Sequence, residues 1–144
     1  MASQLTINFF KEDIRFRLSS QGHLKKWVKN VIQHHRKEGG NINFIFCSDR
    51  YLLGINKNYL NHNTYTDIIT FSSSENNKII AGDIFISVER ICENARSFNS
   101  SFNDELHRVM IHGILHLLGF RDKSSKEKFI MRQKENECLD WRIF

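Results

Sequence analysis

Several features are scarce or absent in this sequence of 144 residues. It contains no proline, no internal repeat and no linker-like segment, so we expect a single domain over residues 1–144. No hydrophobic run approaches the roughly 20 residues that span a membrane. The start of the chain shows no basic segment followed by an apolar one, as a secretory signal would. We therefore expect a cytoplasmic protein that does not associate with membranes.

Cysteine is also rare. Cys47, Cys92 and Cys138 are an odd number of widely spaced residues, and no Cys-x-x-Cys pair occurs. This pattern argues against a disulfide framework and against a zinc site made of thiolates. We expect free thiols in a reducing compartment, and we leave open that one of them adds a distant ligand to a metal.

Acidic residues are outnumbered, with 21 lysines and arginines against 16 aspartates and glutamates and a net charge of +5. This balance favours a polyanionic partner such as RNA, because lysine and arginine bind phosphates and release counterions. Two basic clusters stand out in the sequence: Lys25, Lys26, Lys29, Arg36 and Lys37, and Lys123, Lys126, Lys128, Arg132 and Lys134. A solvated helix surface explains either cluster as well as RNA binding does.

The segment His112-Gly-Ile-Leu-His116 carries the clearest chemical signal. Its two histidines are four residues apart in an apolar run, which places them on one side of a helix. Gly119 can adopt the left-handed conformation that ends a helix, so that the chain turns back and delivers Asp122. Three protein ligands and one open position are typical of a catalytic zinc site. A purely structural histidine pair is the alternative, but buried imidazoles need partners and a shared metal supplies both.

The same segment has the outline of a metalloprotease signature, His-Glu-x-x-His-x-x-Gly-x-x-His. It departs from that signature at Gly113, where a protease carries the glutamate that acts as general base. A metallopeptidase or related hydrolase therefore stays an alternative that lacks its usual base.

The motif His112-Gly-Ile-Leu-His116-Leu-Leu-Gly-Phe120 resembles the signature of the YbeY family, bacterial zinc-dependent endoribonucleases of ribosomal RNA maturation. Upstream, Asn56-Lys-Asn-Tyr59, Thr66-Asp-Ile-Ile-Thr-Phe71 and Gly82-Asp-Ile-Phe-Ile86 are similar to further family segments in the same order. The resemblance implies one Zn²⁺ per chain and a single-strand-specific endoribonuclease of late ribosomal RNA processing, including the 3′ end of 16S rRNA. It also implies the ribosome or its small-subunit particle as a partner.

This sequence departs from the family pattern at several positions, among them Arg121, which aligns with the aspartate that precedes the third ligand. Asp122 aligns with the usual third histidine ligand, and Leu60 aligns with an arginine that is the natural candidate for a phosphate contact. We predict that His112, His116 and Asp122 bind the metal and that Arg121 replaces the missing arginine, with Lys57 and His62 as alternatives. The general acid and base are not identified by the sequence.

Periodicity predicts strands over residues 5–10, 41–47, 67–71 and 79–86, and helices between and after them. Serines that can cap helices are Ser48, Ser87, Ser101 and Ser124, and Gly39-Gly40 is expected to stop the first helix. The expected fold is α+β, a small mixed four-stranded sheet with about five helices and the metal site at the end of a central helix.

Several other residues are assigned more loosely. Asp67 and Asp83 either face the metal site or form turns and caps. His34 and His35 are expected to be structural, and His107 to be exposed. A ribosome-binding factor whose zinc is purely structural is a third functional hypothesis, and it would require a fourth protein ligand.

Overall fold

The chain is described by a computed structural model that covers residues 5–62, 64–74 and 76–144. Expectations that involve residues 1–4, Asn63 and Glu75 lie outside these described residues. The elements, in chain order, are β1 Thr6–Lys11, α1 Gln21–His34, β2 Glu38–Cys47, α2 Asp49–Leu60, β3 Ile68–Ser72, β4 Ile79–Ser87, α3 Val88–Ser97, α4 Phe102–Leu117 and α5 Ser125–Asp140. Within the described part of the chain, no helix is both long and apolar enough to cross a membrane.

The four strands form one mixed sheet in the order β1-β2-β4-β3. β1, β2 and β4 run parallel, and β3 pairs antiparallel with β4 through the hairpin that the sequence predicts. Gly82 allows a close approach of the β3 backbone to β4, because a Cβ atom there would lie 2.3 Å from the carbonyl oxygen of Phe71. The α+β class, the mixed sheet and the five helices agree with the expectation from the sequence.

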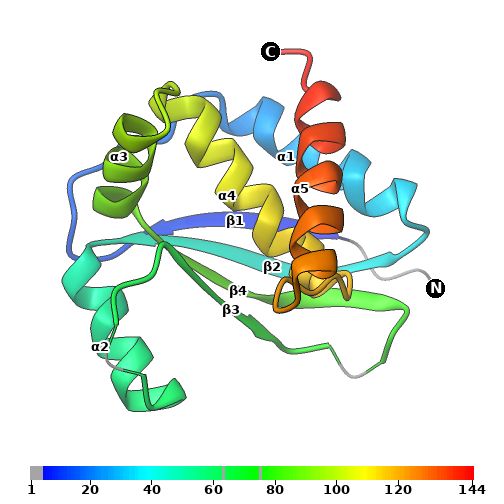
Figure 1. Cartoon of the computed structure of the whole chain (residues 1–144). Coiled ribbons are helices and arrows are strands. Elements are labelled where there is room, and N and C mark those ends of the chain that lie inside the picture. Colours follow the sequence, from blue (N-terminus) through cyan, green and yellow to red (C-terminus); the bar gives the residue numbers. More distant parts are fainter. Residues whose placement is uncertain (1–4, 63, 75) are drawn as a thin grey trace.

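Alternation along the strands divides the side chains between the two faces of the sheet. The main core contains Ile42, Phe44 and Ile84 from the strands, with α1 and α4 packed on them. Figure 1 shows α4 crossing this face between α3 and α5. α2 instead contributes Leu52 to a second, smaller cluster with Cys47 and Ile69, so it covers the opposite face.

α4 is the helix that carries the histidine pair, and it is held closely against the sheet. A Cβ atom at Gly113 would lie 2.9 Å from both Ile68 Cδ1 and Ile84 Cγ2. Gly113 therefore allows α4 to approach the strands closely, and His112 and His116 lie beside this contact with 20% and 27% of their side chains exposed.

The predicted serine caps are confirmed. Ser48, Ser87, Ser101 and Ser124 each precede a helix and accept a hydrogen bond from a backbone N–H in its first turn. Ser124 forms a full capping box with Glu127. These local contacts explain why the starts of four helices could be located from the sequence.

Two expectations were wrong. α1 ends at His34, and Arg36 takes the left-handed conformation with φ 57°, so Gly39 and Gly40 lie in β2 and do not terminate the helix. His107 is only 7% exposed. Its Nδ1 accepts a hydrogen bond of 2.8 Å from Arg142, and the ring packs near Trp27 and Phe144.

Candidate metal centre

The last turn of α4 and the loop after it form the candidate site. The Gly119 N–H bonds to the carbonyl of His116 and the Phe120 N–H to that of Leu115, both at 3.0 Å, while Gly119 has φ 107°. This pair of bonds is a Schellman motif, which ends the helix and reverses the chain. The reversal carries Asp122 back toward the two histidines, as the sequence predicts.

Three potential ligand atoms converge there. His112 Nε2 and His116 Nε2 are 3.0 Å apart, and Asp122 Oδ2 lies 3.2 Å from the first and 3.4 Å from the second. Zinc–nitrogen bonds of about 2.0–2.1 Å at tetrahedral angles place neighbouring ligand atoms about 3.3–3.4 Å apart. The donor set and its separations therefore fit a tetrahedral ion with one position left for a non-protein ligand.

A second carboxylate orients the first histidine. His112 Nδ1 donates to Glu135 Oε2 on α5 at 2.6 Å, and Glu135 Oε1 accepts from Arg108 at 3.0 Å. Glu135 is 5% exposed, so this carboxylate is held by its partners and not by water. The contact places the proton of His112 on Nδ1 and leaves Nε2 free to bind an ion, the usual arrangement behind a metal-binding imidazole.

The same contacts set the charge states. Burial favours the neutral imidazole of His112, but the hydrogen bond and charge of Glu135, helped by Asp122, outweigh it and raise its pKa. Burial alone would raise the pKa of Glu135, but the hydrogen bonds and charges of His112 and Arg108 outweigh burial and lower this pKa below its usual value. The carboxyl of Glu135 therefore stays ionised. A proton on His112 therefore competes with a metal ion.

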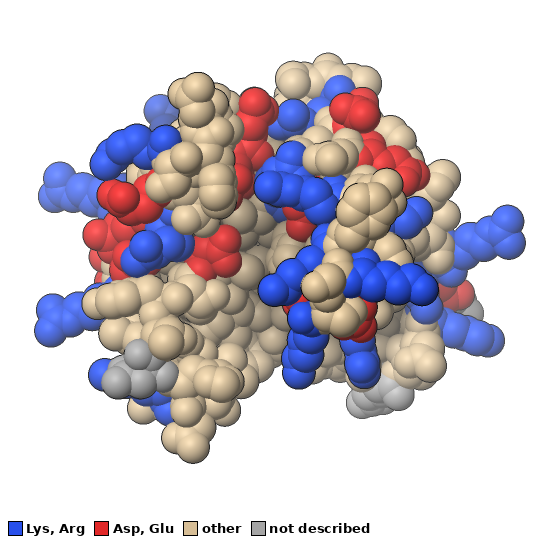
Figure 2. Space-filling view, viewed as in Figure 1, with Lys and Arg blue, Asp and Glu red and all other residues tan. Residues whose placement is uncertain are grey.

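The cluster opens into a cleft of about 320 Å³ between α3, α4 and α5. Figure 2 shows this face hollowed near its centre, with Lys and Arg gathered on the α5 side. Its lining residues include Asp67, Asn94, Arg108, His112, Asp122, Arg132 and Glu135. The cleft thus combines a potential ion site, the further carboxyl groups of Asp67, Glu105 and Glu135, and two guanidinium groups.

Asp67 lies just before β3 and lines this cleft, one of the two positions left open by the sequence. Its Oδ2 accepts from Asn94 Nδ2 at 3.2 Å. Burial raises the pKa of Asp67, against the opposing charge of His112, so this carboxyl holds a proton more readily than an exposed aspartate does. Asp83, in contrast, accepts from Asn43 Nδ2 at 2.9 Å on the other face of the sheet.

Comparison with known proteins decides the family. A sequence model described as Endoribonuclease YbeY matches residues 7–141. Endoribonuclease YbeY of Cytophaga hutchinsonii is 47% identical over 139 residues, which cover 96% of this chain and 97% of that protein. Endoribonuclease YbeY of Christiangramia forsetii is 50% identical over 133 residues, 92% of each chain. The chain belongs to the YbeY endoribonuclease family.

The fold agrees with this membership of the YbeY family. The solution structure of the Thermotoga maritima protein TM1509 matches with a TM-score of 0.65 and 30% identity, over 95% of this chain and 92% of that one. The similarity extends over nearly all of the fold.

Not every residue singled out from the sequence lies in the YbeY cleft. Arg121 is exposed beside Asp122, and His62 is exposed after α2; neither lines the described cleft. Sequence reasoning missed Glu135 as a partner of His112 and missed the position of Arg132. Few positions of α5 are buried, so its sequence does not indicate which of its residues face α4. The positions of Glu135 and Arg132 depend on how α5 packs against α4.

Proposed function

We propose that the protein is a zinc-dependent endoribonuclease that cuts single-stranded ribosomal RNA, with the ion held by His112, His116 and Asp122. The observation that carries this proposal is the convergence of two imidazoles and a carboxylate, with Glu135 behind His112, at an open cleft. Family membership supports the reaction class. We further propose that it acts in the cytoplasm on the 3′ end of 16S rRNA within the small-subunit particle.

The residues of the cleft have distinct roles in this proposal. A bound divalent ion supplies a Lewis acid for the phosphoryl group and lowers the pKa of water. Glu135 keeps the His112 ring in one tautomer and one orientation. Asp67 is the proton carrier in this proposal. Burial raises the pKa of its carboxyl, and Asp67 lines the same cleft as His112.

Two arginines are proposed to bind the RNA backbone. Arg121 adjoins Asp122 on the exposed loop, whereas Arg132 lines the cleft from α5. The side chain of Arg132 is 56% exposed and has one contact of 3.4 Å with Glu135, so most of its N–H groups can reach a phosphate. Arg108 has fewer N–H groups free for a phosphate, because it donates hydrogen bonds to both Glu135 and Asn136.

The two alternative functions have less support. In a metallopeptidase the residue after the first histidine is the general base, but Gly113 faces Ile68 and Ile84 across the sheet interface, away from the cleft. A structural zinc would need a fourth protein ligand. Among the described residues the potential ligand group contains no cysteine, and Cys47 Sγ donates instead to the carbonyl of Ile86 at 3.5 Å.

The test is cleavage of a single-stranded ribosomal RNA fragment by zinc-loaded protein and by a His112→Ala/His116→Ala protein purified in parallel. Cleavage by the first alone is expected. Equal cleavage by both proteins would refute a catalytic ion, and repeating the assay with other divalent ions tests the choice of zinc. Cleavage of naked fragments and of small-subunit particles is compared to test the proposed partner.

The arginine assignments are tested in the same assay with Arg121→Ala and Arg132→Ala. Arg15→Ala is the matched control, because Arg15 is exposed between β1 and α1 and lines no described cavity. If an arginine binds a phosphate, its replacement by alanine should raise KM for the RNA. The replacement should also lower the slope of the salt dependence of RNA binding by about one unit. An Arg121→Ala protein that cuts RNA like the wild type would leave Arg132 as the phosphate contact.

A further inference from the structure

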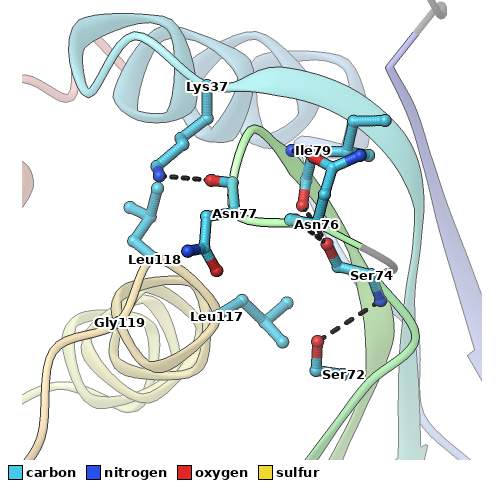
Figure 3. A pocket seen from close by; sticks show the side chains of 9 residues that line it. All are labelled: Lys37, Ser72, Ser74, Asn76, Asn77, Ile79, Leu117, Leu118 and Gly119. Atoms are coloured by element: carbon cyan, nitrogen blue, oxygen red, sulfur yellow. Dashed lines mark hydrogen bonds between the residues drawn. The ribbon is translucent and has the colours of Figure 1, made fainter.

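A second cavity adjoins the metal centre and has no role in the function proposed above. It has a volume of about 400 Å³ and lies between the end of α4 and the β3–β4 hairpin. Figure 3 shows Lys37, Asn77, Leu117 and Leu118 around it, with Ser74 and Asn76 on the hairpin side. We call this cavity, with these six residues, the Lys37 pocket. Its size is within the range of small-ligand sites.

The lining of the Lys37 pocket selects for a particular chemistry. Leu117 and Leu118 offer an apolar surface, and the hairpin offers amide and hydroxyl groups. Lys37 is the cation, and no carboxylate lines the pocket in the described residues. This combination fits a flat ring with hydrogen-bonding edges that is attached to an anionic group, which is the chemistry of a nucleotide.

The hairpin holds its shape through its own bonds. Asn76 Oδ1 accepts from the N–H groups of Lys78 at 2.9 Å and Ile79 at 3.2 Å, and Ser74 Oγ donates to the Asn76 carbonyl. Lys37 Nζ donates to the Asn77 carbonyl. These contacts bind the hairpin to the start of β2 and present a formed surface to a ligand.

The side chain of Asn77 is not used in any of these bonds. Within the described residues its amide makes no hydrogen bond, and Figure 3 shows it directed into the space beside Leu117 and Leu118. An amide offers both a donor and an acceptor, so it can pair with the edge of a nucleobase. Lys37 keeps two further N–H donors for a phosphate.

The position of the pocket links it to the metal centre. Leu117, Leu118 and Gly119 line it, and these residues directly follow His116 and precede Asp122. The pocket thus lies at the end of α4, within three residues of His116 along the chain.

We infer that the Lys37 pocket binds one unpaired nucleotide of the RNA, close to the phosphate that is cut, with Asn77 on the base edge and Lys37 near the backbone. The inference rests on the proposed function. It gives a physical reason for cutting single strands, because a base must be unpaired before it can enter a pocket of this kind.

The experiment tests whether the pocket binds the base of one particular nucleotide. Cleavage is measured on single-stranded RNA oligonucleotides that carry one abasic residue at successive positions around the cut, with wild-type protein, Asn77→Ala and the control Asn103→Ala. Asn103 is exposed at the start of α4, at the far end of that helix from the histidines. Melting temperature and zinc affinity are measured for each protein to show that fold and metal site are retained.

We expect one abasic position to lower kcat/KM of the wild type about tenfold, a typical loss for a base contact. On unmodified RNA, Asn77→Ala should have a kcat/KM that is lower than that of the wild type by a similar factor. On the RNA with that abasic position, Asn77→Ala and the wild type should have the same kcat/KM. Asn103→Ala should behave as the wild type on both RNAs. If the losses in kcat/KM from Asn77→Ala and from the abasic residue multiply at every position, the pocket does not bind a base. The proposed function would still stand in that case. Absence of zinc-dependent cleavage of unmodified RNA would refute both.

Discussion

Replacing His107 with asparagine should remove a pH-dependent part of the stability of the protein. His107 is buried against Trp27 and Phe144, and Arg142 donates to its Nδ1. Burial, and secondly the charge of Arg142, lower its pKa from 6.5 to about 4, while Asp104 opposes this weakly. The folded state therefore binds the proton less readily than the unfolded chain does.

The size and sign of the effect follow from this difference. The contribution of His107 is fully present above pH 6.5 and is lost as the pH falls toward 4. With about 1.4 kcal/mol for each pKa unit, folding should lose roughly 2 kcal/mol between pH 7 and pH 4.5 from this residue alone. Asparagine keeps an acceptor near the position of Nδ1 for Arg142, but it carries no titrating group.

The assay is urea unfolding of wild type and His107→Asn at pH 7 and pH 4.5, with His62→Asn as control because His62 is exposed. The variant is expected to be less stable at pH 7, since it loses ring contacts. The difference between the two proteins should shrink by roughly 2 kcal/mol at pH 4.5, and the control should follow the wild type. A difference that is the same at both pH values would refute the reasoning.

Three further predictions concern the cleft. Glu135→Gln should weaken zinc binding about 10–100-fold in calorimetric titration, because His112 loses its ionised partner; wild-type affinity would contradict this role. Asp67→Asn should lower kcat about 100-fold or more with zinc affinity unchanged, and an unchanged kcat would exclude Asp67 as a proton carrier. Gly113→Glu should destabilise the fold by about 3 kcal/mol or more in urea unfolding, because a carboxylate would enter the sheet interface. A stable Gly113→Glu protein with peptidase activity would overturn the packing argument.

Much of the fold could be predicted from local signals. Alternation along the strands located the sheet, and serine caps located the starts of four helices, since both depend on residues close in sequence. The turn at Gly119 was predictable for the same reason. The end of α1 was not, because Arg36 adopts a left-handed conformation that usually favours glycine.

The site divides in the same way. His112, His116 and Asp122 lie within one short segment, so their spacing alone predicted that they converge. Glu135 and Arg132 reach the cleft from α5, and Arg142 reaches His107 from the end of the chain. Spacing within a helix does not show which other helix will pack beside it, so these partners required the structure.

The Schellman turn after α4 has an evolutionary consequence. Its two hydrogen bonds join backbone atoms only, and Gly119 supplies the one unusual dihedral angle. The side chain at position 122 is delivered to the histidines without taking part in the turn. Mutation can therefore exchange a nitrogen donor for an oxygen donor there while the scaffold is inherited intact. A single substitution at position 122 would therefore change the donor set of the candidate site while the hydrogen bonds of the turn stay as they are.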